Sequence, residues 1–190
     1  MKKDKQTLRA KSLGFRARSI FKLFEINKKF NLIKEKDRVL DLGCWPGSWL
    51  QFCSNLNCTC VGVDLRTTEK IKDCTFIKGD VHNKEIIKKI IKSGKFDIVL
   101  SDLAPKTTGI KDLDQDYSTN LALRALEISN LVLKNKGNFL CKIFQSKETN
   151  HFTHEARKCF DYVKIYKPMS SKKRSKEVYV IAKSKHNLNV

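Results

Sequence analysis

The charged residues that stand inside or beside apolar runs of this sequence are its first candidates for chemistry. Lys142 lies within one apolar run, Asp102 follows another, and Lys22 and Glu177 have apolar neighbours near the two ends of the chain. A lysine in an apolar strand is costly, and burial favours its neutral amine, which can serve as a general base. Each of these side chains could instead be an ordinary solvated charge, and Lys142 could reach solvent from its strand end.

Acidic residues at the ends of successive apolar runs predict a binding pocket. Four aspartates lie at or near such ends: Asp41, Asp64, Asp80 and Asp102. If the runs are parallel strands, their carboxyl ends meet at one edge, where ligands bind in open α/β sheets. Asp64 is placed to bond ribose hydroxyls, Asp80 could accept from an adenine amine, and Asp41 could face the ammonium group of a methionine moiety. The alternative is that each aspartate caps a following helix.

The turn between Gly43 and Trp49 follows the first apolar run and favours a nucleoside ligand over a phosphate. Gly43 and Gly47 let the backbone approach a ligand closely. Pro46 removes one of the backbone N–H groups that a pyrophosphate site needs. The acids around the turn suit a ligand that carries positive charge, as a sulfonium does. We therefore expect a nucleoside cofactor without phosphates.

The elements that must position these residues are short apolar runs separated by helical patterns. The runs occupy residues 38–43, 58–64, 75–80, 96–102, 137–144, 162–166 and 177–182, and the helical patterns are clearest at 83–92 and 116–133. Strands that alternate with helices form mainly parallel sheets with helices on both faces. The sequence therefore predicts an α/β fold with a seven-stranded, mostly parallel sheet.

Length and composition favour a single domain. The chain has 190 residues, of which 41% are hydrophobic, which is enough for one sizeable core. Residues 1–19 are polar and basic and lead into an amphipathic helix that starts at Ile20. We predict a basic arm over 1–19, a single domain over 20–183 and a tail over 184–190.

Four blocks of this sequence resemble the FtsJ/RrmJ family in their order and spacing. The blocks are Ile20-Phe21-Lys22-Leu23, Ser101-Asp102-Leu103-Ala104-Pro105, Cys141-Lys142-Ile143-Phe144-Gln145 and Ser175-Lys176-Glu177-Val178-Tyr179. They hold that family's Lys-Asp-Lys-Glu tetrad, and the similarity runs from about residue 13 to residue 183. The resemblance implies a Rossmann-like methyltransferase domain that uses S-adenosylmethionine, releases S-adenosylhomocysteine and methylates ribose 2′-hydroxyls of RNA.

The resemblance also implies roles for the residues of the site. Lys142 would be the base, Asp102 and Lys22 would orient it and the hydroxyl, and Glu177 would complete the charge network. Burial and the Lys22 ammonium favour a neutral Lys142, whereas Asp102 and Glu177 favour its charged form, which would steer the hydroxyl electrostatically instead. The family's cofactor contacts fall on Gly47, Trp49, Asp64, Asp80 and Asp102, to which the strand-end reasoning adds Asp41 and Gly43.

Two segments depart from the family pattern. Cys44 and Trp45 stand where the family usually has small residues, so Trp45 is expected to narrow or reshape the cofactor loop. The run Gln145-Ser146-Lys147 lacks the glycine that commonly follows the glutamine, and this could alter how the loop after the fifth strand reaches RNA.

The balance of charge points to a polyanionic partner. Thirty-nine basic against twenty acidic residues give a net charge of +19, and RNA is such a partner. The N-terminal arm could be a solvated, disordered tail in the free protein and become ordered on binding. Basic residues on both sides of the tetrad blocks are expected to hold phosphates: Arg16, Arg18, Lys172, Lys173 and Arg174.

The length of the chain narrows the choice of RNA. It resembles the ribosomal RNA enzymes of the family more than the tRNA or cap enzymes, which usually extend further. We predict a monomer that methylates a uridine of large-subunit ribosomal RNA, with target choice resting on RNA shape or on a ribosomal particle. The alternatives are a tRNA methyltransferase, a non-catalytic ribosome-assembly protein on the same fold, and a methyltransferase for proteins or small molecules.

Cysteines, histidines and hydropathy set the remaining expectations. Seven cysteines without a Cys-x-x-Cys pair favour a reducing compartment over zinc or disulfides. His151 and His154 are expected to be surface residues rather than metal ligands. No run approaches the roughly twenty apolar residues of a membrane span. We expect the cytoplasm, with the mitochondrion or another organelle as the alternative because the N-terminus is basic and poor in acids.

Overall fold

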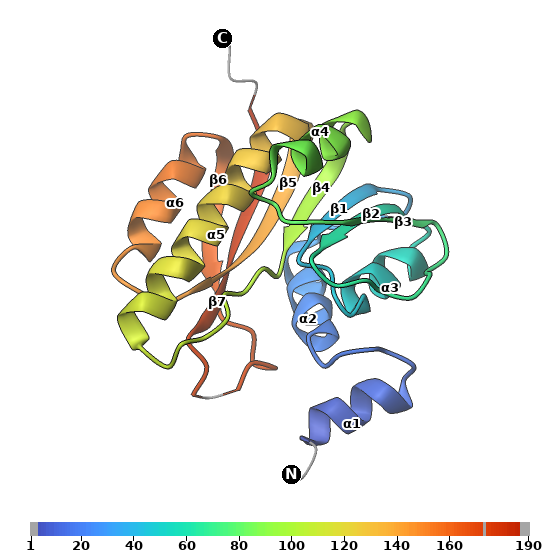
Figure 1. Cartoon of the computed structure of the whole chain (residues 1–190), viewed down its shortest axis with the longest axis horizontal. Helices are drawn as coiled ribbons and strands as arrows, with labels where there is room; N and C mark the ends of the chain where they lie inside the picture. The colour runs from blue at the N-terminus through green and yellow to red at the C-terminus, as the bar shows by residue number, and fades with distance from the viewer. Residues whose placement is uncertain (1–3, 173, 187–190) are drawn as a thin grey trace.

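The computed structural model describes residues 4–172 and 174–186, and within them one sheet joins all the strands, with helices on both of its faces (Figure 1). The strands are β1 (Arg38–Leu42), β2 (Thr59–Asp64), β3 (Cys74–Lys78), β4 (Phe96–Ser101), β5 (Leu133–Phe144), β6 (Phe160–Tyr166) and β7 (Glu177–Lys185). The helices are α1 (Lys5–Ser12), α2 (Ile20–Phe30), α3 (Ser48–Asn55), α4 (Lys84–Lys92), α5 (Lys111–Val132) and α6 (Thr149–Arg157).

The sheet has the order β3-β2-β1-β4-β5-β7-β6. Neighbouring strands from β3 to β5 are parallel, whereas β7 runs antiparallel to both β5 and β6. The prediction of a seven-stranded, mostly parallel sheet is thereby confirmed. Because β7 is reversed, its first residues lie at the same edge as the last residues of β4 and β5.

Two apolar layers hold the helices against the sheet. On one face, Leu40 and Leu42 of β1 pack in a cluster with residues of α4, α5 and α6. On the other face, Val39 belongs to a cluster with residues of α2 and α3. This alternation follows from the period of two in a strand. Full burial of each such aliphatic side chain contributes about 1.5–3 kcal/mol, so the sheet is fixed from both sides.

Helix α2 carries the first residue of the predicted tetrad. Its apolar side chains Ile20, Leu23 and Ile26 are buried at helical spacing, and Lys22 is buried between them. The helix ends at Asn31, whose left-handed backbone (φ 49°) breaks the helical repeat. The packed stripe on α2 therefore fixes the direction in which Lys22 enters the fold.

Two elements begin four or more residues earlier than the apolar pattern predicts. Helix α5 starts at Lys111 rather than at 116, because its first turn is held by acids instead of apolar residues: the Asp114 carboxylate accepts the backbone N–H of Thr108 at 2.7 Å. Strand β5 starts at Leu133 rather than at 137, because Leu133 pairs with Phe96 before an irregularity in the ladder.

The N-terminal arm contains a helix in the part that the structure describes. Asp4 caps α1 by accepting the backbone N–H of Gln6 at 3.1 Å. Ala10 is fully buried, and the Arg9 guanidinium lies 5.1 Å from the centre of the Phe21 ring. Contacts with α2 thus order this segment. The sequence alone did not decide whether it is ordered or a disordered tail in the free protein. Among the described residues, no helix is long and apolar enough to cross a membrane.

Candidate active site

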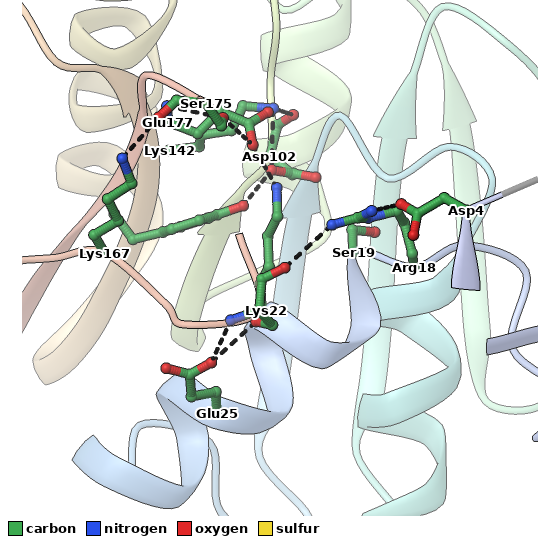
Figure 2. Close-up of polar contacts among 12 residues, drawn as sticks. Asp4, Arg18, Ser19, Lys22, Glu25, Asp102, Lys142, Lys167, Ser175 and Glu177 are labelled. Carbon is green, nitrogen blue, oxygen red and sulfur yellow. Dashed lines mark hydrogen bonds and ion pairs between the residues drawn. The ribbon is translucent and has the colours of Figure 1, made fainter. Parts of the chain in front are cut away.

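The four tetrad residues meet at one edge of the sheet, although they come from four separate elements (Figure 2). Lys22 enters from α2, Asp102 follows β4, Lys142 lies near the end of β5, and Glu177 begins β7. The register of the antiparallel pair places Glu177 opposite Phe144, at the carboxyl end of β5. The topology therefore brings together the residues that the sequence singled out.

Two short ion pairs join these residues. The Lys22 ammonium lies 2.6 Å from a carboxylate oxygen of Glu177. Lys142 Nζ lies 3.1 Å from Asp102 Oδ1 and donates to the backbone carbonyl oxygen of Asp102 at 2.8 Å. Lys142 is only 5% exposed and Lys22 only 8% exposed. Neither lysine is a freely solvated surface charge.

The Glu177 carboxylate stays ionised in this setting. Burial alone would raise the pKa of Glu177, but the charge and hydrogen bond of Lys22, with help from Lys142 and Ser175, outweigh it and lower the pKa. The Ser175 hydroxyl lies 3.1 Å from the same carboxylate oxygen that Lys22 contacts. Glu177 is thus a fixed negative charge that holds the Lys22 ammonium in place.

Tyr179 is a member of the cluster that the sequence reasoning missed. Its hydroxyl donates to Asp102 Oδ1 at 3.1 Å, and Lys22 Nζ lies 5.7 Å from the centre of its ring. Complete burial, followed by the charges of Asp102 and Glu177, raises the pKa of Tyr179 well above its usual value, so the hydroxyl remains a donor. Its position two residues after Glu177, on the same face of β7, was the signal that could have identified it.

A cavity of about 340 Å³ opens beside the tetrad. Its volume falls at the small end of ligand sites, which span roughly 300–1,000 Å³. Three of the tetrad residues and two of the expected phosphate contacts line this cavity. Its lining consists of Arg18, Ser19, Lys22, Asp102, Lys172, Ser175 and Glu177.

The loop after β1 lies close to other protein segments at its two glycines, and the ligand contact expected there stays a prediction. Gly43 has φ 77°, and a Cβ atom there would lie 2.9 Å from the backbone nitrogen of Leu103. Gly47 has φ 104° and caps the start of α3, and a Cβ atom there would lie 2.9 Å from a methyl carbon of Ile71. Both positions therefore require glycine on conformational and steric grounds.

The strand-end aspartates are not helix caps. The residues that cap α3, α4 and α5 are Gly47, Asn83 and Ile110. The Asp64 carboxylate instead accepts the backbone N–H groups of Trp45 at 3.0 Å and Arg66 at 2.9 Å. Asp64 thereby ties the loop after β1 to the loop after β2. Asp80 is exposed and accepts the backbone N–H of His82 at 2.9 Å.

Asp41 is the most unusual of these acids. It is fully buried within β1, and neither carboxyl oxygen has a hydrogen-bond partner in the part of the chain that the structure describes. Burial, and then the charges of Asp102 and Asp64, raise the pKa of Asp41 well above its ordinary value. A buried polar group without a hydrogen-bond partner is costly. This carboxyl therefore suits a cationic ligand, which would supply the missing hydrogen bonds and the opposite charge.

The two tryptophans, Trp45 in the loop after β1 and Trp49 on α3, occupy different environments. Trp49 is 3% exposed, and its indole N–H donates to the backbone carbonyl of Ser19 at 3.1 Å. Trp49 is therefore a buried side chain held by Ser19, and the cofactor contact that the resemblance implies for it stays a prediction. Trp45 is 46% exposed, and the Arg66 guanidinium lies 4.5 Å from the centre of its ring. Its side chain thus stacks with Arg66 at the surface, whereas the sequence led us to expect that it narrows or reshapes the loop.

The expected phosphate contacts have separate places in the structure. The Arg16 guanidinium donates to the Thr68 hydroxyl at 2.7 Å and to the Pro46 carbonyl at 3.2 Å, so it braces the loop after β1. The phosphate contact expected for Arg16 stays a prediction. Arg18 pairs with Asp4 and donates to the Ser170 carbonyl at 3.1 Å. Lys172 and Arg174 are exposed, and Lys173 lies outside the described residues.

The histidines and cysteines of the described residues form no metal-binding cluster. Within the described residues, no group of three or more His, Cys, Asp or Glu side chains is arranged to hold a metal ion. His151 and His154 lie on α6 and are exposed, as expected for surface residues. All seven cysteines lie in the described part of the chain and have free thiols.

Comparison with known proteins gives a consistent match over nearly the whole chain. The model of the FtsJ-like methyltransferase family matches residues 15–185. A protein of Archaeoglobus fulgidus named ribosomal RNA large subunit methyltransferase E is 40% identical over 185 residues, covering 95% of this chain and 97% of that protein. A protein of Pelagibacter ubique with the same name is 43% identical over 175 residues, covering 90% and 86%.

A solved structure agrees with these sequence matches. The crystal structure of a ribosomal RNA methyltransferase of Plasmodium falciparum superposes with a TM-score of 0.79 at 27% identity, covering 90% of this chain and 98% of that chain. The strand order and the reversed β7 described above therefore belong to a Rossmann-like methyltransferase fold.

Proposed function

Because this chain belongs to the FtsJ-like methyltransferase family, we propose that it transfers the methyl group of S-adenosylmethionine to a ribose 2′-hydroxyl of RNA, a uridine of large-subunit ribosomal RNA. The observation that carries the proposal is the pair of buried lysines, Lys22 and Lys142, each fixed by a carboxylate beside one cavity. An assembly protein that only binds RNA has no need for such a cluster.

The acids around the loop after β1 support this cofactor. We assign Asp64 to the ribose hydroxyls, Asp80 to the adenine amine and Asp41 to the cationic methionine moiety. The unpartnered, fully buried carboxyl of Asp41 fits a ligand with positive charge. Gly43 and Gly47 would allow the ligand to lie against the backbone. When bound, S-adenosylmethionine supplies an electrophilic methyl group on a sulfonium.

We assign to Lys142 the role of accepting the proton of the 2′-hydroxyl or of stabilising the negative charge that develops on its oxygen. Nitrogen Nζ of a lysine has three positions for hydrogen bonds. The carbonyl and carboxylate oxygens of Asp102 occupy two of them in Lys142, which leaves one for the substrate. In the neutral amine that position accepts the proton, and in the ammonium it donates to the oxygen and stabilises developing negative charge. A positioned base contributes about 10²- to 10⁴-fold to the rate.

The remaining residues of the cluster orient this lysine and the substrate oxygen. Tyr179 holds Asp102 Oδ1, and Glu177 holds the ammonium of Lys22. A hydroxyl held in line with the methyl group loses little entropy at the transition state, which accounts for up to about 7–11 kcal/mol in well-oriented reactions.

Basic residues around the cavity support RNA as the substrate. We propose that Arg18, Lys172 and Arg174 contact phosphates, in a protein whose net charge is +19. Such contacts position the RNA without reading its sequence. Selection of one uridine would then rest on the shape of the RNA or of a ribosomal particle. We further propose a monomer that acts in the cytoplasm, a reducing compartment that suits seven free thiols.

The test is transfer of a labelled methyl group from S-adenosylmethionine to total RNA and to ribosomal particles, with wild type and Lys142→Ala compared. The product is mapped as dinucleotides that resist nuclease because their 2′-oxygen is blocked. Label in such dinucleotides that is lost in the variant supports the proposal. Label on a base, on tRNA alone, or on no RNA at all, while the cofactor still binds, contradicts it.

A further inference from the structure

The loop between β6 and β7 (residues 167–176, described except at 173) runs beside α2 next to the active-site cavity (Figure 2). It contains five basic residues and no acidic one. Like charges so close together repel one another, so the loop needs contacts from another element to stay folded against the protein. Its residue Lys172 lines the cavity, and Ser175 near its end contacts Glu177.

Glu25 of α2 supplies the main attachment of this loop. One of its carboxylate oxygens accepts from the Tyr166 hydroxyl at 2.6 Å and from the Met169 backbone N–H at 2.7 Å. The other accepts from the Ser170 backbone N–H at 3.1 Å and from the Ser170 hydroxyl at 3.0 Å. All four donors belong to the end of β6 or to the loop. A charged acceptor forms stronger hydrogen bonds than a neutral one.

The same helix binds the loop at both of its ends. Glu25 is three residues after Lys22, so the two side chains lie on one face of α2. Lys22 holds Glu177 just beyond the end of the loop, and Glu25 holds Met169 and Ser170 near its start. Arg18, which precedes α2, adds a bond to the Ser170 carbonyl at 3.1 Å.

We propose that Glu25 is a positioning residue that fixes the β6–β7 loop to α2 and thereby sets Lys172 at the wall of the active-site cavity for the RNA backbone. The inference rests on the proposed function for its RNA part, whereas the attachment of the loop is a property of the protein alone. Burial alone would raise the pKa of Glu25, but the hydrogen bonds from Tyr166, Met169 and Ser170 outweigh it and lower the pKa. The carboxylate is therefore ionised at neutral pH.

The test variant is Glu25→Gln, with Met169→Ala as the matched control. An amide places N–H donors where one carboxylate oxygen accepted, so two of the four donors of the loop lose their acceptor. Met169→Ala removes a side chain that is 89% exposed and keeps the backbone N–H that Glu25 binds. Tyr166→Phe, which removes one of the four bonds, is the milder variant if Glu25→Gln does not fold.

Limited digestion with trypsin measures the attachment without any substrate. Cleavage after Lys172, Arg174 or Lys176 should be faster once Met169 and Ser170 have left α2, because the released loop can adopt the extended form that a protease binds. We expect Glu25→Gln to be cut there roughly tenfold faster than wild type, the scale of one charge-assisted hydrogen bond. Met169→Ala should be cut at the wild-type rate and Tyr166→Phe at an intermediate one. Equal rates in Glu25→Gln and wild type overturn the inference.

Kinetics test the consequence for RNA. In Glu25→Gln the KM for RNA should rise on the order of tenfold, while the Kd for S-adenosylhomocysteine stays within about twofold of wild type. An unchanged KM for RNA, or a loss that appears in cofactor affinity, overturns the positioning role. A wild-type protein that methylates no RNA contradicts the proposed function instead, and the trypsin comparison then still decides whether Glu25 holds the loop.

Discussion

Lys142 contacts Asp102 twice, through the backbone carbonyl oxygen at 2.8 Å and through carboxylate oxygen Oδ1 at 3.1 Å from its Nζ atom. The first of these contacts does not depend on the charge of Asp102. The place of Nζ is therefore fixed by the backbone of the residue that follows β4, and the carboxylate adds an electrostatic contribution. A lysine held in this way is positioned before any substrate arrives.

Replacement of Lys142 should abolish most of the activity without loss of the fold. We expect Lys142→Met, which keeps the apolar stem of the side chain, to lower the single-turnover rate of methyl transfer by about 10²- to 10⁴-fold, because the group that handles the proton is gone. The Kd for S-adenosylhomocysteine, measured by calorimetry, should remain within about twofold. A rate within tenfold of wild type would refute the assignment.

The Lys22–Glu177 pair should behave as one unit. Removal of one charge leaves the other buried without its partner, so Lys22→Met and Glu177→Gln should each slow transfer. The double variant should lose less than the two single losses combined, with a coupling of about 0.5–3 kcal/mol. The measurement is a double-mutant cycle on the transfer rate at saturating RNA. Strictly additive losses would mean that the 2.6 Å contact has no part in catalysis.

Asp41 predicts an unusual dependence of stability on pH. Its raised pKa means that the folded protein keeps a proton that the unfolded chain releases above the ordinary aspartate pKa. This group therefore lowers the free energy of unfolding as pH rises from the ordinary aspartate pKa toward the raised pKa of the folded state, by at most about 1.4 kcal/mol per pH unit. Asp41→Asn should remove that slope and be more stable than wild type at pH 8, while it binds S-adenosylhomocysteine more weakly.

Urea unfolding of both proteins at pH 5 and pH 8, without ligand, measures this effect. Asp97→Asn is a suitable contrast, because hydrogen bonds from Lys134 and Arg38 outweigh burial and lower the pKa of Asp97. Its removal should destabilise the protein at both pH values. If wild type and Asp41→Asn respond equally to pH, Asp41 is ionised in the folded state.

Trp45 should report cofactor binding directly. The chain has two tryptophans, and Trp49 is buried, so a change in emission on addition of S-adenosylhomocysteine should come from Trp45 beside Asp64. Trp45→Ala should abolish the change and weaken binding about two- to fivefold, the equivalent of the 0.5–1 kcal/mol of an exposed cation–π pair. Arg66→Ala should weaken binding equally and keep the signal. A signal that persists in Trp45→Ala would assign it to Trp49.

The fold was predictable because strand and helix patterns in this chain follow from burial. Runs such as that around Leu40 are apolar on both faces, as buried parallel strands require, and α2 shows its stripe from Ile20 onward. The prediction was wrong at the start of α5, where Asp114 replaces apolar contacts with hydrogen bonds to the preceding turn. Such local bonds leave no periodic signal in the sequence.

The tetrad was visible because a charge inside an apolar run is conspicuous, whereas its supporting residues were not. Tyr179 looks like any aromatic core residue until its hydroxyl is found beside Asp102. Glu25 looks like a solvated charge on a helix, and Arg16 like one more basic residue of the arm. Their partners lie far away in the sequence, so only the tertiary structure identifies what they do.

The contact between Lys22 and Glu177 also has a consequence for the time at which this protein can act. The two residues are 155 positions apart, and the intervening chain contains six of the seven described strands. Closure of so long a loop is slow and follows the formation of local structure. A nascent chain whose β7 has not yet left the ribosome has no Glu177 to hold Lys22. The ribosome that makes this protein must therefore synthesise β7 before the Lys22–Glu177 pair, and with it the proposed active site, can form.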